Sequence, residues 1–236
     1  VGGGTLTNTE DSPSNVFATW NSLDNYYPAM TLSYGNTRAL TITNKYTYIP
    51  TTLGMTSGKY YAEIKCTAQS SSQEAFLIGI SSTSSTGTTQ QLGEYANDYS
   101  YYASNGNYRN NDTNTSYGSA FTTGDIIGIA VDLDNNKLYF RKNNDAWNNS
   151  GDPTSGATGT GAISITDPTS TPRGAYFFAV CYWSSTNNGT FDANFGNGYF
   201  GTTAVASAGT NASGIGIFEY DVPTGFTALS TKGLNL

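Results

Sequence analysis

The stretch from Gly124 to Asn144, GDIIGIAVDLDNNKLYFRKNN, decides the fold of this chain. Side chains along a β-strand alternate between its two faces. The first half of the stretch therefore places a set of aliphatic residues on one face: Ile127, Ile129, Val131 and Leu133. The run Asp134–Asn136 tolerates left-handed backbone and bonds its own main chain, which predicts a turn.

The residues after this turn alternate in the same way. Leu138 and Phe140 point inward, whereas Lys137, Tyr139 and Arg141 point outward. The whole stretch is predicted to be a core β-hairpin with a solvated outer face. It contains no catalytic machinery.

Composition favours β-structure throughout the chain. The charged fraction is 11%, and the polarity comes instead from Asn, Thr, Ser and Gly, with 18 Tyr. Such a composition suits strands and turns and keeps helix propensity low. A chain of 236 residues buries roughly 70–75% of its unfolded surface, so it needs no metal or disulfide to fold.

Charge and residue counts exclude several classes of function. The net charge is −7 and the 10 basic residues are scattered, so we expect neither nucleic-acid nor membrane-surface binding. The apolar runs are of strand length, too short for a membrane-spanning helix. Histidine is absent, which removes the commonest general base and the Ser–His and Cys–His nucleophile schemes. The chain begins with Val1, as a processed product or one segment of a longer protein would.

The two cysteines, Cys66 and Cys181, lie inside strand-like stretches. We predict two buried thiols that act as small hydrophobic side chains, with a single disulfide as the alternative. Two sulfurs without histidine make no zinc site. The run Asp132–Asn136 lacks the glycine and distal glutamate of a calcium loop, so no metal or cofactor is predicted. A calcium site among the Asp and Asn loops stays an alternative.

The predicted organisation is one antiparallel β-sandwich with two flanking segments. Residues 1–30 form an N-terminal linker or edge segment, 31–200 the sandwich, and 201–236 an extended C-terminal segment that packs on the sandwich or on a neighbour. Gly, Pro and Asn separate the predicted strands, which are 31–34, 39–43, 59–67, 75–81, 100–103, 126–133, 137–142, 175–183 and 190–194. Residues 81–91, 143–163 and 198–216 are predicted to be long connections.

Five ordered motifs resemble the SPRY (B30.2-like) domain, a bent, concanavalin-like jelly-roll sandwich. They are Gly58–Glu63 (GKYYAE), Ile78–Ile80, the hairpin Gly124–Asn143, Ala175–Trp183 and Phe191–Gly196 (FDANFG). The match departs from the family pattern at Ala62, where an aromatic residue is common, and at Asn144, where a glycine is usual. The resemblance implies an all-β binding fold rather than an enzyme.

The flanks carry a second resemblance. Asp11–Asn21 (DSPSNVFATWN) looks like the lead-in of SPRY-bearing tail and virion proteins in bacteriophage and environmental viral sequences. Gly214–Gly216 and Pro223–Leu229 (PTGFTAL) resemble their trailing segment. The resemblance implies a protein at the virion surface, in a tail fibre or a capsid decoration.

The segment Tyr95–Tyr117 carries the strongest recognition chemistry. Its tyrosines alternate with Asn, Ser and Arg, a mixture that gives large contact area and adaptable hydrogen bonds and that also suits sugars. The alternative is that alternate tyrosines line the core with their hydroxyls at its rim. The predicted ligand-binding residues are Tyr99, Tyr101, Tyr102, Asn107, Tyr108, Arg109 and, in a polar loop, Trp147.

Carboxylates are the remaining candidates for catalysis. Asp132 and Asp134 lie two apart at the hairpin turn, where we expect capping and solvation rather than chemistry. A second group could converge in space, although no spacing requires it: Glu63, Glu74, Glu94 and Asp98. No catalytic residue is predicted.

The sequence favours a non-enzymatic virion surface protein that adheres to a host glycan or protein, or to neighbouring virion subunits as a homo-oligomer within an assembly. The alternatives are a carbohydrate-binding module of a secreted or cell-surface protein and a structural filament or lattice subunit. The peptide-recognition role of SPRY domains in ubiquitin-ligase adaptors is weakest, because no RING, coiled-coil or SOCS-box segment accompanies the domain.

Overall fold

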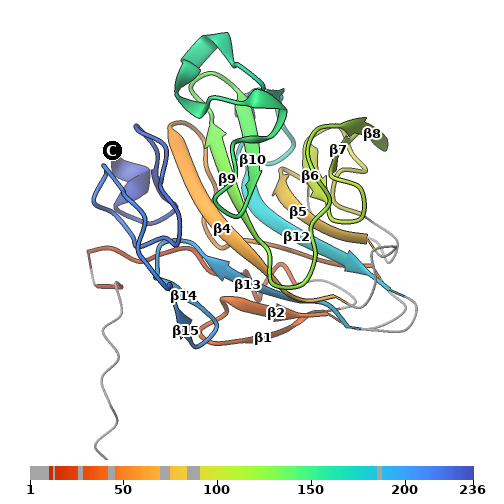
Figure 1. Ribbon diagram of the computed structural model, residues 1–236, viewed down its shortest axis with the longest axis vertical. Helices are drawn as coiled ribbons and strands as arrows, with labels where there is room; N and C mark the ends of the chain where they lie inside the picture. Colours follow the sequence, from red (N-terminus) through yellow and green to blue (C-terminus); the bar gives the residue numbers. More distant parts are fainter. Residues whose placement is uncertain are drawn as a thin grey trace, which may run out of the picture.

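The computed structural model describes residues 11–12, 14–25, 29–41, 46–69, 75–83, 91–184 and 188–236. Within these residues two β-sheets pack face to face (Figure 1). The only helical elements there are short 3-10 turns, as the low helix propensity predicts: Asn148–Ser150, Pro153–Thr158, Pro168–Ser170 and Gly233–Asn235. The predicted all-β antiparallel sandwich is confirmed.

The first sheet contains eight of the described strands. Their order is β1 (Thr31–Ser33), β2 (Arg38–Leu40), β13 (Thr190–Asn194), β4 (Lys59–Ala68), β9 (Ile126–Asp132), β10 (Lys137–Lys142) and β11 (Ile163–Ser164). The eighth, β16 (Thr227–Ala228), pairs in parallel with β4, whereas all the other pairs are antiparallel.

The second sheet contains six strands in the order β3 (Thr47–Pro50), β12 (Phe177–Trp183), β5 (Ala75–Ser81), β6 (Asp98–Tyr102), β7 (Asn107–Asn110) and β8 (Thr113–Ser116). A separate small hairpin joins β14 (Tyr199–Phe200) to β15 (Thr203–Ala204). The sequence did not predict β3, β7 and β8, because these strands are short and polar or end in proline. Most of the predicted loop 81–91 falls outside the described residues, as do residues 1–10, 13 and 26–28 of the predicted N-terminal segment 1–30.

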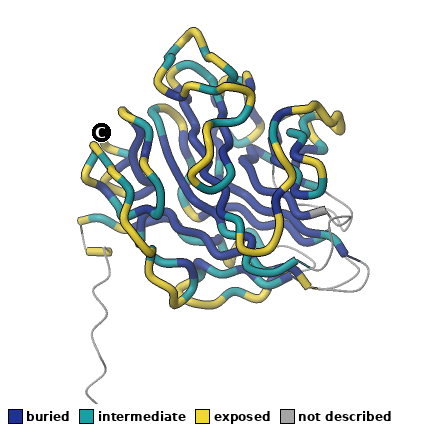
Figure 2. Tube along the Cα trace, viewed as in Figure 1, coloured by how far each residue is buried: buried dark blue, intermediate teal, exposed yellow. Residues whose placement is uncertain are grey.

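The hairpin 124–144 forms with the predicted inward face. β9 and β10 pair so that Leu138 lies opposite Val131 and Phe140 opposite Ile129. These residues belong to the main core between the two sheets, together with Ile127 and other aliphatic and ring side chains. Figure 2 shows that the strands of the two sheets are mostly buried. Asp132 closes the turn by accepting hydrogen bonds from the backbone and side chain of Asn135.

The prediction that the outer face of this hairpin is solvated is wrong. Tyr139 is fully buried and Arg141 is 6% exposed. The C-terminal segment, residues 205–236, runs along the outer side of the eight-stranded sheet (Figure 1). It covers Tyr61, Ala130 and Tyr139 with a second apolar cluster made of Ile215, Phe218, Val222 and Phe226.

Glu63 of β4 anchors the C-terminal segment to the eight-stranded sheet through hydrogen bonds. Its fully buried carboxylate accepts hydrogen bonds from the backbone amides of Glu219 (2.8 Å) and Tyr220 (2.9 Å). The Tyr61 hydroxyl (3.0 Å) and the Asn194 amide (3.2 Å) also donate to it. Burial raises the pKa of Glu63 to about 7, although the amides of Glu219 and Tyr220, the Tyr61 hydroxyl and the charge of Arg141 oppose the shift.

Arg141 adds a second tie to the C-terminal segment. Its guanidinium donates to the Tyr61 hydroxyl (3.1 Å) and to the backbone oxygen of Asp221 (2.5 Å). It also lies 4.8 Å from the centre of the Trp147 ring and 5.8 Å from that of Tyr220. The charge is therefore held between aromatic faces rather than in water.

The two terminal segments are paired with each other. The amide of Ala18 donates to the backbone oxygen of Leu229 (2.9 Å), and Thr231 donates to Val16 (2.9 Å). Trp20 is fully buried and donates from Nε1 to the backbone oxygen of Thr37 (3.0 Å). Residues 16–20 and 229–231 are thus built into the sandwich.

Both cysteines are buried thiols, and no disulfide joins them. Cys66 lies on β4 in the main core, whereas Cys181 lies on β12 in a cluster on the outer side of the six-stranded sheet. Burial raises the pKa of each thiol to about 12, so neither is a reactive thiolate at neutral pH. The prediction of two buried thiols is confirmed.

Candidate binding surface

The tyrosine segment divides between the two faces of the six-stranded sheet. β6 pairs with β5 so that Tyr101 lies opposite Ile78 and Tyr99 opposite Ile80. Tyr99 is 4% exposed and Tyr101 is fully buried, both in the main core. The Tyr101 hydroxyl donates to the backbone oxygen of Ser119. These two residues fit the alternative interpretation, in which tyrosines line the core with their hydroxyls at its rim, and neither reaches a ligand at the surface.

Tyr108 also belongs to the inner side. It lies opposite Tyr101 on β7 and packs against the core, with its ring centre 5.8 Å from that of Tyr117. Half-buried, it presents only part of its surface.

Tyr102, Asn107 and Arg109 of the predicted set face outward. Tyr102 is half-buried and lies opposite Leu77, whose side chain belongs to the outer cluster. Arg109 pairs with Ser100 and so shares this face with Asn107 two residues earlier. The Arg109 guanidinium donates to Gln91 and Asp112, which hold it in place.

Two aromatic residues outside the predicted set complete this surface. Tyr46 and Trp183 stack with ring centres 5.7 Å apart and an interplanar angle of 28°. Both are half-buried and pack, like Tyr102, on a buried floor of Leu77, Ala179 and Cys181. We call the partly exposed residues of this face the outer aromatic patch: Tyr46, Tyr102, Asn107, Arg109 and Trp183.

The sequence alone gave neither Trp183 nor Tyr46 a binding role. The alternation along β12 contains the missing signal, since Trp183 shares its parity with Cys181 rather than with Val180. It could be used only once the face occupied by Val180, which belongs to the main core, was known.

Trp147 lies away from the patch. Its ring packs edge-on against Tyr61 (6.4 Å) and Tyr139 (6.3 Å) on the outer side of the eight-stranded sheet. Trp147 therefore shares no surface with Tyr102 or Arg109, and it shields Arg141.

The patch is uncharged apart from Arg109, and its phenols remain protonated. Burial raises the pKa of both Tyr46 and Tyr102 above the ordinary value for tyrosine. Both hydroxyls can therefore donate and accept hydrogen bonds at neutral pH. Flat aromatic faces beside an amide and a guanidinium form a surface suited to recognition.

The candidate carboxylates do not converge. Glu63 lies under the C-terminal segment, and Asp98 lies on β6 of the other sheet, where it accepts a 2.6 Å hydrogen bond from Ser81. Burial raises the pKa of Asp98 to about 6. Glu94 accepts from the amide of Gln91 (2.9 Å), and Glu74 lies outside the described residues. Among the residues that the structure describes, no three His, Cys, Asp or Glu side chains gather into a metal site.

Comparison with known proteins agrees with the fold. Residues 59–163, from the start of β4 to β11, match the family model of the SPRY domain. The SPRY domain of human HERC1 is similar at 16% identity over 70% of this chain and 91% of that one, with a TM-score of 0.55. The stonustoxin structure is similar at 16% identity over 75% of this chain, with a TM-score of 0.50, and the match spans 27% of the stonustoxin chain. The two-sheet sandwich is thus a SPRY fold.

A search of curated proteins found no match. In the described part of the chain, no helix is long and apolar enough to span a bilayer.

Proposed function

We propose that this chain is a non-enzymatic recognition module that binds its partner through the outer aromatic patch. The observation that carries the proposal is the partly exposed stack of Tyr46 and Trp183 beside Tyr102 and Arg109. Trp, Tyr and Arg are the residues that most often dominate the energy of protein interfaces. The matched domain is a protein–protein interaction module, which supports a protein partner.

The absence of enzymatic activity is part of the proposal. The chain has no histidine, and the buried carboxylates Glu63 and Asp98 belong to different sheets, where each serves a hydrogen-bond network. Hydrolysis of a polysaccharide by the purified protein, abolished by changing one acidic residue, would overturn this part.

The proposed setting is the virion surface, with a host surface protein or glycan, or a neighbouring virion subunit, as the partner. Its support is the resemblance of Asp11–Asn21 and Pro223–Leu229 to the flanks of viral proteins. These two motifs lie together and are paired through Ala18 and Leu229, so they form one continuous unit beside the matched domain. Mass spectrometry of purified virus particles tests this setting, and the absence of the chain from intact particles would contradict it.

Copies of this chain are a further proposed partner within an assembly. β8 lies at the edge of the six-stranded sheet, and its four residues are all exposed. An exposed edge offers unpaired backbone groups to another strand. Mass measurement in solution over a range of concentrations tests this proposal, and a persistent monomer at high concentration argues against it.

A peptide-display selection against the purified chain tests the patch itself. We expect enriched peptides whose affinity falls at least tenfold in Trp183→Ala and Tyr102→Ala. The matched control is Tyr95→Ala, which removes a 45% exposed ring outside the patch and leaves affinity unchanged. Peptides that bind all three variants equally would place the binding surface elsewhere.

A further inference from the structure

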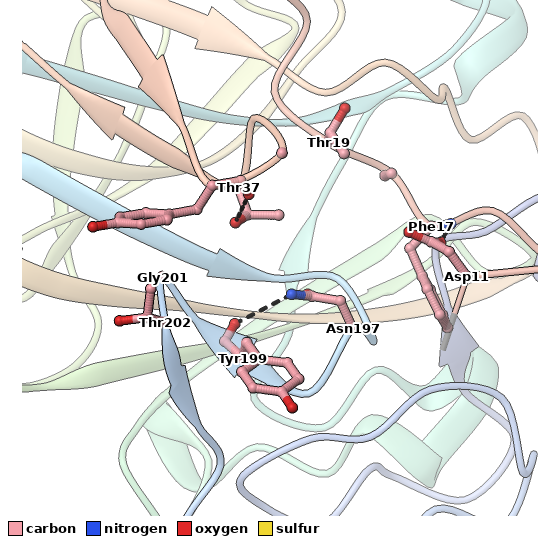
Figure 3. A pocket seen from close by; sticks show the side chains of 11 residues that line it. Asp11, Phe17, Thr19, Thr37, Asn197, Tyr199, Gly201 and Thr202 are labelled. Carbon is pink, nitrogen blue, oxygen red and sulfur yellow. Dashed lines mark hydrogen bonds between the residues drawn. The ribbon is translucent and has the colours of Figure 1, made fainter. Parts of the chain in front are cut away.

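A pocket of about 420 Å³ lies away from the outer aromatic patch, beside the N-terminal segment (Figure 3). It is bounded by residues 17–19, by the turn between β1 and β2, and by the start of the β14–β15 hairpin. Small-molecule sites generally measure roughly 300–1,000 Å³, so the pocket has the size of a ligand site. Its lining combines aromatic rings, hydroxyls and one amide: Phe17, Thr19, Tyr34, Thr37, Asn197, Tyr199 and Thr202.

The turn that carries Tyr34 is conformationally strained. Tyr34, Gly35 and Asn36 have φ values of 52°, 64° and 63°, all in the left-handed region. A bulky aromatic residue rarely adopts this conformation, and such outliers cluster at functional sites. The buried Trp20 holds the turn, because its amide donates to the backbone oxygen of Asn36 (2.8 Å) and its indole to that of Thr37 (3.0 Å). Tyr34 is nevertheless 47% exposed. The strained turn therefore holds the Tyr34 ring at the surface.

Positive charge near the pocket is neutralised. The guanidinium of Arg38 lies 4.6 Å from the centre of the Tyr34 ring. It is also paired with both oxygens of the 2% exposed Asp192, at 2.5 and 2.6 Å. The only carboxylate among the residues that line the pocket belongs to Asp11. An anionic ligand therefore finds no available cation among the lining residues, which favours an uncharged ligand.

The amide of Asn197 supplies an unused acceptor. Its Nδ2 donates to the backbone oxygen of Tyr199 (3.4 Å), as Figure 3 shows. Its Oδ1 is buried and has no hydrogen-bond partner. A buried acceptor without a partner costs free energy.

We propose that this pocket binds a neutral saccharide unit. The rings of Tyr34 and Tyr199 offer flat faces for the C–H surfaces of a pyranose, and Asn197 with the threonine hydroxyls offers hydrogen bonds to its hydroxyl groups. The site contains none of the outer aromatic patch and is independent of it. It adds a second site, specific for neutral glycans, to the recognition surface proposed above.

A glycan array with neutral and acidic oligosaccharides, followed by calorimetry with the best neutral binder, tests the proposal. Tyr34→Gly is the most informative variant, because glycine accepts the left-handed backbone without strain while the ring is deleted. We expect Tyr34→Gly and Tyr199→Ala to weaken binding of the neutral glycan about tenfold or more. The melting temperature of Tyr34→Gly should not fall.

Two controls separate this pocket from other surfaces. Tyr95→Ala removes a 45% exposed ring elsewhere, and Leu23→Ala removes a 95% exposed side chain that does not line the pocket. Both should leave glycan affinity unchanged. The proposal is overturned if no neutral glycan binds, if only sialylated or sulfated glycans bind, or if Tyr34→Gly binds as tightly as the unaltered protein.

Discussion

The backbone amide of Tyr220 donates a 2.9 Å hydrogen bond to Oε1 of Glu63, which lies 157 residues earlier in the chain. This contact joins the C-terminal segment to the middle of the eight-stranded sheet. It closes the outer face of that sheet around Tyr61 and Tyr139. The outer face of the six-stranded sheet keeps a partly exposed aromatic surface, where we place recognition.

Removing the Glu63 carboxylate should loosen the C-terminal segment. Glu63→Ala leaves two backbone amides, one amide side chain and the Tyr61 hydroxyl without their acceptor. Because a buried unsatisfied donor costs roughly 1–3 kcal/mol, we expect the free energy of unfolding in urea to fall by at least about 2 kcal/mol. The exposed Asp145→Ala is the control and should change little. An equal effect of both changes would argue against the Glu63 network.

Stability should decrease as pH rises from about 5 to 8. The folded state raises the pKa of Glu63 from 4.5 to about 7, so it holds the proton more tightly than the unfolded chain does. The stabilisation is complete below pH 4.5 and is lost as pH passes through about 7. It amounts to about 3 kcal/mol at most. Asp98, whose pKa is raised to about 6, contributes in the same direction.

Melting temperatures across this pH range measure the effect. The unaltered protein should melt at a higher temperature at pH 5 than at pH 8. The difference should shrink in Glu63→Gln, which cannot titrate. A melting temperature that climbs with pH in the unaltered protein would show that the carboxylate is ionised throughout.

Phe218→Ala should open a cavity under the C-terminal segment. The ring is 1% exposed and packs edge-on against Tyr61, with ring centres 5.0 Å apart. Deleting a buried phenylalanine side chain costs about 3–5 kcal/mol, and calorimetric unfolding should show a loss of this size. Leu23→Ala, at a 95% exposed position, is the matched control. A small effect of Phe218→Ala would mean that the segment does not pack on the sheet in solution.

No residue with a side chain larger than that of glycine should fit at position 79 of β5. A Cβ atom there would lie 1.9 Å from the backbone oxygen of Tyr99 and 2.8 Å from Cα of Ser100. Backbone cannot move aside as a flexible side chain can, so Gly79→Ala should cost at least about 3 kcal/mol. The yield of soluble protein and its melting temperature measure this. Gly174→Ala is the comparison, because a Cβ atom there meets open space and only the positive φ is strained; equal melting temperatures would contradict the close strand contact.

Strand alternation predicted the inner face of the hairpin and failed on its outer face. The period of two separates Ile129 from Ala130, and the aliphatic set identifies the core side. The outer face is closed by Phe218 and Phe226, which lie some eighty residues beyond the hairpin in a Gly- and Thr-rich segment without strand periodicity. Only the tertiary structure brings them to Tyr139.

The prediction of the binding residues was limited in the same way. Strand alternation places Tyr101 and Tyr102 on opposite faces. Because both faces carry polar and aromatic residues, the sequence does not say which of the two tyrosines points inward. The pairing with Ile78 and Leu77 of β5 decides it. The partner rings are distant in sequence, because Tyr46 lies just before β3 and Trp183 ends β12. Neither could be joined to Tyr102 before the strand order was known.

Hydroxyl-radical footprinting read by mass spectrometry tests most directly whether one outer face is closed and the other is open for recognition. Oxidation should be measurable at Tyr46, Tyr102 and Trp183, and it should fall when a selected peptide is bound. Tyr61, Tyr139 and Phe218 should stay protected with or without the peptide. Strong oxidation of Tyr61 and Phe218, with Trp183 protected in the free protein, would contradict both the closed face and the proposed binding surface.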